Sequence, residues 1–147
     1  MISHYGNLAI NLVISLVLMY LVMFTMIDGL GDFYNNLNTF YMALMMVAPM
    51  AILMLLMMGS MYQSKRLNLV LYVGFVALFV AAFAFMRAQS FIGNEQFLRS
   101  MIPHHSGAIL MCREATVSDP EIVALCGRII ESQRQEIVQM KGILSRY

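Results

Sequence analysis

Three long apolar runs without a charged residue constrain this chain more than any other feature. They are Leu8–Ile27 with 20 residues, Phe40–Met58 with 19 and Leu69–Met86 with 18. About 20 apolar residues in an α-helix cross a hydrocarbon core of roughly 30 Å. Such a segment must be helical, because lipid offers no partner to free backbone groups. The sequence therefore predicts an all-α integral membrane protein with three transmembrane helices, the first of them retained rather than cleaved as a signal peptide.

The loops between these runs predict a direction for the spans. Lys65 and Arg66 lie in the second loop, whereas the first loop, residues 28–39, has no basic residue. Basic loops stay in the cytoplasm. We therefore expect a bacterial inner-membrane protein with a cytoplasmic N-terminus and a periplasmic C-terminal domain.

The composition changes sharply after the third run. Residues 1–64 contain no Lys or Arg, whereas residues 95–147 contain six basic and six acidic side chains. This change divides the chain into a membrane domain, 1–92, and a polar domain, 93–147. In the polar domain a helix is expected from Asn94, which can cap it, to about Thr116, and a second from a cap at Ser118 or Asp119 to about Leu144.

These two helices form an antiparallel hairpin if the chain folds back near residue 119. Helical spacing gives the first helix an inward face of Phe97, Met101, His104, His105, Ala108, Met111 and Cys112. The inward face of the second is Ile122, Cys126, Ile129, Ile130, Gln133, Ile137, Met140 and Leu144. Folding about residue 119 sets His105 opposite Gln133, and it leaves Met140 about one turn from the level of Met101.

One hairpin is too small to form a stable core alone. Doubling it in a homodimer would give a four-helix bundle, and packing on the membrane domain is the alternative. A stripe of small residues in the third span would also allow close helix packing, within the chain or with a second copy. We therefore expect a homodimer or a higher homo-oligomer.

The first helix of the hairpin concentrates soft metal donors. Met101 and His105 are four residues apart and share a face, His104 borders it, and Met140 can reach in from the second helix. Thioethers bind Cu(I) and Ag(I) well and bind Zn(II), Mg(II) or Ca(II) poorly. Gln133 could form a hydrogen bond with one of the imidazoles and so fix its tautomer. Core packing of the methionines is the competing explanation.

A sequence resemblance favours the metal interpretation. The run Phe97-Leu98-x-x-Met101-Ile102-Pro103-His104-His105-x-Gly107-Ala108-Ile109-x-Met111 resembles the signature of a bacterial family designated a domain of unknown function, and Ile129-Ile130-x-x-Gln133-x-x-Glu136-Ile137-x-x-Met140 continues the match. Members have a ferritin-like helical bundle, and some are periplasmic copper-binding proteins linked to copper and silver tolerance. The resemblance implies copper as Cu(I), or silver, bound at Met101, His104, His105, Met111 and Met140. It does not cover the three spans. Many members have Asp-Met-Ala where this chain has Leu110-Met111-Cys112.

Cys112 and Cys126 face each other in this hairpin. If the C-terminal domain lies in an oxidising compartment outside the inner membrane, a disulfide is expected. A Cu(I) thiolate site and two buried free thiols are the alternatives.

The leading hypothesis is a non-enzymatic protein that buffers Cu(I) or Ag(I), or hands the metal to an exporter or a periplasmic chaperone. A membrane thiol oxidoreductase using Cys112 and Cys126 is a second hypothesis, but the two residues do not form a Cys-x-x-Cys pair. A haem electron carrier with His105 and a methionine as axial ligands is a third. A net charge of +1 gives no reason to expect nucleic-acid binding. A di-iron oxidase is excluded because the chain has no Glu-x-x-His motif.

Overall fold

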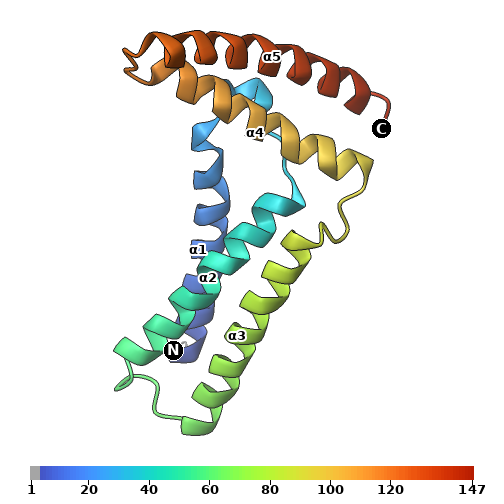
Figure 1. The fold of residues 1–147 in the computed structure, drawn as a ribbon. Coiled ribbons are helices and arrows are strands. Elements are labelled where there is room, and N and C mark those ends of the chain that lie inside the picture. The colour runs from blue at the N-terminus through green and yellow to red at the C-terminus, as the bar shows by residue number, and fades with distance from the viewer. Residues whose placement is uncertain (1–3) are drawn as a thin grey trace. The chain divides into compact units, whose positions relative to one another are not determined.

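A computed structural model describes residues 4–147, so the N-terminus and the first three residues of the predicted membrane domain lie outside the described residues. Within residues 4–147 the secondary structure consists of five α-helices and two short 3-10 helices, η1 and η2, without a strand (Figure 1). The prediction of an all-α chain is confirmed. Contacts divide the chain into two compact units.

The first unit, residues 1–22 and 38–90, contains the apolar helices. They are α1 (His4–Val22), α2 (Leu37–Met57) and α3 (Lys65–Arg87). Three helical segments are long and apolar enough to cross a membrane, by length and composition: His4–Met26, Leu37–Met57 and Lys65–Arg87. They overlap the three predicted runs, so the prediction of three apolar helices is confirmed at that level.

The core of the first unit is small and lies mainly between α1 and α2. Its buried members are Leu8, Leu12, Val47, Ala51, Leu55 and Tyr62. Much of the remaining apolar surface of these helices is exposed, as on α3, where Ala82 is the buried residue. Apolar helices that expose this much surface are typical of segments that face lipid.

The second unit comprises residues 23–37 and 91–147. It contains α4 (Asn94–Glu114) and α5 (Pro120–Leu144), which pack side by side (Figure 1), together with η1 (Met23–Met26) and η2 (Leu30–Asp32). Its core consists of Leu98, Ile102, Ile109, Ile137 and Met140, and the partly buried residues packed on it are Tyr34, Met101, Ile130, Ile143 and Leu144. We call these ten residues the α4–α5 cluster.

Local signals explain where α5 begins. The Asp119 carboxylate accepts hydrogen bonds from the backbone N–H groups of Glu121 and Ile122, and Pro120 occupies the first helical position. This confirms the expected cap. The cap expected at Asn94 is wrong, because Gly93 precedes the first helical residue and the Asn94 side chain donates to the Tyr147 hydroxyl instead.

The segment Met23–Leu37 differs most from the sequence-based division. It was placed in the membrane domain, 1–92, but it packs with α4 and α5. Asp28 and Asp32 of this segment form ion pairs with residues of α4 and α5. These contacts explain why the segment belongs to the second unit.

Candidate functional site

His105 of α4 and Glu136 of α5 contact each other between the two helices. Nδ1 of His105 lies 3.0 Å from Oε2 of Glu136. Gln133 lies as far from Cys126 along α5 as His105 lies from Cys112 along α4, and these cysteines are bonded, so Gln133 keeps the level opposite His105 that the sequence predicts. Side chains on a helix lean toward its N-terminus, so the long Glu136 side chain extends back toward the level of Gln133 and contacts the histidine there.

Met101 and Met140 keep the offset of about one turn that the sequence predicts. Met101 lies one helical turn before His105 on α4, and Met140 lies one turn after Glu136 on α5. Met101 and Ile137 lie equally far from their bonded cysteines and are therefore level with each other, so Met140 lies about one turn from the level of Met101. Both belong to the α4–α5 cluster, in which Met140 is buried and Met101 is partly buried.

Three residues of the predicted inward face of α4 lie on its exposed side. Phe97 is 50% exposed and Met111 is 54% exposed, and His104 is exposed as well. Leu98, Ile102 and Ile109 are buried instead. The buried surface of α4 is rotated relative to the expected face because the helix packs on the Met23–Leu37 segment as well as on α5.

Burial controls the protonation of His105. Desolvation is the main influence and lowers the pKa of His105 below the ordinary value of 6.5. The Glu136 carboxylate opposes this effect, and His104, whose ring centre is 6.0 Å away, adds to it. The His105–Glu136 distance is that of an ion pair, but within residues 4–147 the buried Nδ1 atom has no aligned hydrogen bond. Burial thus favours the neutral form of His105, and its buried Nδ1 atom is unsatisfied.

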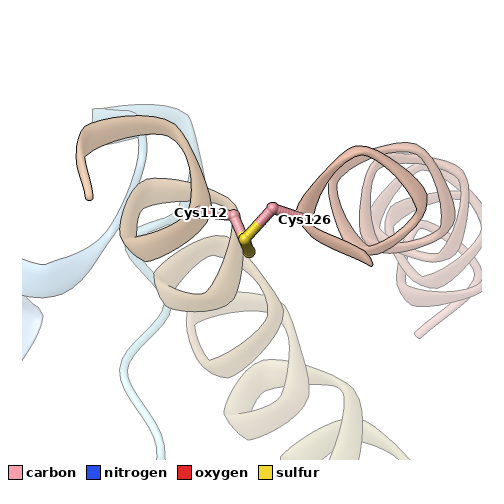
Figure 2. The surroundings of a disulfide bond; sticks show 2 residues. All are labelled: Cys112 and Cys126. Atoms are coloured by element: carbon pink, nitrogen blue, oxygen red, sulfur yellow. A yellow bond between two sulfur atoms is a disulfide. The ribbon is translucent and has the colours of Figure 1, made fainter. Parts of the chain in front are cut away.

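Cys112 and Cys126 form a disulfide between α4 and α5, which selects one of the three alternatives left open by the sequence. Figure 2 shows the two side chains joined between the helices, and their Cα atoms are 5.2 Å apart. The bond fixes the two helices near the turn that connects them. His105 lies two helical turns away from it on α4.

Sequence reasoning overlooked Glu136 as a site residue. Its signal was present, since Glu136 lies three residues after Gln133 and so borders the same face of α5. A polar group next to the cluster was also overlooked. It consists of Asp28, Asp32, Ser106, Arg113 and Lys141.

The donors that α4 and α5 bring together are two thioethers and one imidazole. Among the described residues, no group of three or more His, Cys, Asp or Glu side chains is arranged to hold a metal ion. Methionine sulfur does not belong to that set. A soft cation is the ligand that thioethers and a neutral imidazole suit.

The fold is that of an all-helical protein with three apolar helices and a helix pair joined by a disulfide. Residues 82–144 match the family model described as Domain of unknown function (DUF305). The chain is also 37% identical over 119 residues to "Uncharacterized protein L153" of Acanthamoeba polyphaga mimivirus, a match that covers 80% of this chain and 76% of the viral protein. No solved structure matches the chain.

The chain belongs to the family of the L153 protein, and α4 and α5 lie within its DUF305 region. The 119 aligned residues exceed the length of the chain from residue 82 onward. The similarity to the viral protein therefore extends into the apolar helices.

Proposed function

We propose that this chain is a membrane-anchored protein that binds Cu(I) or Ag(I) between α4 and α5, without enzymatic activity. The observation that carries the proposal is the buried His105 imidazole, whose Nδ1 atom lacks a hydrogen bond, one turn from Met101 on α4, which packs in the same cluster as Met140. An unsatisfied polar atom in a buried position costs free energy, and a bound metal would remove that cost.

The chemistry of these donors favours a soft monovalent ion. Thioether sulfur is neutral and polarisable, so it binds Cu(I) and Ag(I) better than Zn(II). A histidine must be neutral to bind a metal. Burial lowers the pKa of His105 and so favours the neutral form that binds a metal.

His104 and Met111 have a different place in the proposal. Both are exposed on α4 of the single chain, so they are suited to pass the ion to or from a partner protein. Phe97, His104 and Met111 follow one another at intervals of seven residues on the same side of the helix. We propose that this stripe packs against a second copy of the chain in a homodimer. A mass measurement in detergent that gives only monomer at micromolar concentration would contradict this proposal.

The anchor is proposed to be the set of three apolar helices, inserted in an inner membrane with α4 and α5 in the periplasm. Lys65, in the first turn of α3, and Arg66 beside it carry the orientation through the positive-inside rule. The protein would then buffer metal outside the cytoplasm, or hand it to an exporter or a chaperone, and contribute to metal tolerance. A cysteine introduced at Ser145 should react with an impermeant reagent in intact spheroplasts; protection there would reverse the orientation.

The metal proposal is tested by anaerobic titration of the purified full chain with Cu(I), Ag(I) and Zn(II). The double variant His104→Ala/His105→Ala should bind Cu(I) at least 10-fold more weakly than the wild type. His4→Ala is the matched control, since His4 lies at the start of α1, and it should leave the affinity unchanged. Equal Cu(I) affinity in the wild type and the double variant, or preference for Zn(II) at pH 7, would overturn the proposal.

A further inference from the structure

The Met23–Leu37 segment reaches the proposed site from a distant part of the sequence. Tyr34 belongs to the α4–α5 cluster, together with Met101 and Met140. At the other end of the segment, the carbonyl oxygen of Met26 would lie 3.2 Å from a Cβ atom placed on Gly107. The segment therefore lies directly against α4 and covers part of the cluster.

Asp32 joins this segment to both helices at once. One carboxylate oxygen accepts a hydrogen bond from the Ser106 hydroxyl of α4 at 2.6 Å, and the other accepts one from Nζ of Lys141 on α5, also at 2.6 Å. Ser106 is fully buried, and the Asp32 side chain is 14% exposed. We call Asp32, Ser106 and Lys141 the Asp32 bridge.

Each arm of the Asp32 bridge ends beside a proposed ligand. Ser106 follows His105 on α4, and Lys141 follows Met140 on α5. The bridge therefore connects the two helices at the end where the soft donors lie, whereas the Cys112–Cys126 disulfide connects them near their turn.

Further contacts keep Asp32 in place. The backbone N–H of Asp28 donates to the Ser106 hydroxyl at 2.7 Å, and the Asp28 carboxylate pairs with Arg113. At the end of the segment, the backbone N–H of Leu37 donates to Oε1 of Gln96 at 3.0 Å. The Asp28–Arg113 and Asp32–Lys141 contacts join opposite charges, and charge-assisted hydrogen bonds are stronger than neutral ones.

We infer that Asp32 is a positioning residue for the proposed metal site and that the Met23–Leu37 segment forms its third wall. The inference rests on the proposed function, because it assigns the segment a role in holding His105 and Met140 at the spacing that one ion requires. Ligands have to be held to within about 0.5 Å by the residues that surround them. The segment leads directly into α2 (Leu37–Met57), so the metal site is tied to the chain between the first two apolar helices.

The test uses the full chain in detergent and the variants Asp32→Asn and Lys141→Gln, with Glu131→Gln as the control. Glu131 is an exposed acid of α5 that is hydrogen-bonded to Gln135, outside the bridge. Asp32→Asn should weaken Ag(I) binding about 10-fold, as is typical when a residue that orients a ligand is removed. Lys141→Gln removes one arm and should act in the same direction, Asp32→Glu should restore part of the affinity, and Glu131→Gln should leave it unchanged.

A second readout does not depend on metal. In the metal-free protein, the methyl signals of Met101 and Met140 in a spectrum of 13C-methyl methionine should shift in Asp32→Asn and stay in place in Glu131→Gln. A wild-type chain that fails to bind Ag(I) overturns the proposed function, and the methyl signals still decide whether Asp32 positions the helices. Wild-type Ag(I) affinity or unshifted Met101 and Met140 signals in folded Asp32→Asn and Lys141→Gln overturn the inference about Asp32.

Discussion

Nδ1 of His105 lies 3.0 Å from Oε2 of Glu136 across α4 and α5, without an aligned hydrogen bond. Glu136 is half-exposed, whereas His105 is buried. The carboxylate therefore does not offset the loss of hydration of the imidazolium form, and burial lowers the pKa of His105.

The first prediction concerns stability of the metal-free protein against pH. The folded-state pKa of His105 is below the unfolded value of 6.5, so below pH 6.5 the unfolded chain binds more protons at this residue. The contribution of His105 to the free energy of unfolding is fully present above pH 6.5 and is lost as pH falls through the folded pKa. Denaturant titrations at pH 7.5 and pH 5 should show this loss in the wild type and a smaller one in His105→Gln. The same pH dependence in both proteins would contradict the prediction.

The second prediction concerns the methionine sulfurs. Replacing Met101 and Met140 with Leu nearly conserves side-chain volume and should cost less than about 1.5 kcal/mol of stability per site. Loss of two soft donors should weaken Cu(I) binding by at least 10-fold, measured by anaerobic competition with a chromophoric chelator. Met57→Leu is the control, because Met57 lies at the exposed end of α2. Wild-type Cu(I) affinity in the double variant would show that these sulfurs only fill the core.

The third prediction concerns the disulfide. Cys112 and Cys126 are 14 residues apart in the sequence, and closing a loop of this length stabilises a fold by about 3 kcal/mol in the chain-entropy model. Cys112→Ser/Cys126→Ser should lower the unfolding free energy of the second unit by about that amount, as measured by chemical denaturation. A reducing agent should have the same effect on the wild type and none on the variant.

The fourth prediction compares two glycines in α4 and α5. A Cβ at Gly107 would lie 3.2 Å from the Met26 carbonyl oxygen, whereas a Cβ at Gly127 meets nothing within 4 Å. Gly107→Ala should therefore destabilise the second unit by about 1 kcal/mol through crowding. Gly127→Ala should stabilise it by up to about 1 kcal/mol, because alanine favours a helix interior. Thermal melts that shift in the same direction for both variants would contradict the close packing of η1 on α4.

Local patterns determined the elements of this protein. Uncharged runs of 18 to 20 residues specify the apolar helices, because hydropathy and length are properties of a continuous segment. The Asp119 cap and Pro120 mark the start of α5 for the same reason, since a cap acts within four residues. The set of soft donors on α4 also follows from spacing along one helix.

The tertiary structure decided which donors meet. Whether Gln133 or Glu136 faces His105 depends on how far each side chain leans along its helix, and Met111 was excluded from the cluster by the rotation of α4 toward the Met23–Leu37 segment.

The Asp32 bridge depends wholly on the tertiary structure. Asp32 is separated from Ser106 by 74 residues and from Lys141 by 109. An ion pair leaves no periodic pattern in the sequence, because it requires only that two charges be brought together. The amino-acid sequence therefore determined the helices and their chemistry, while contacts between distant segments determined which side chains form the site.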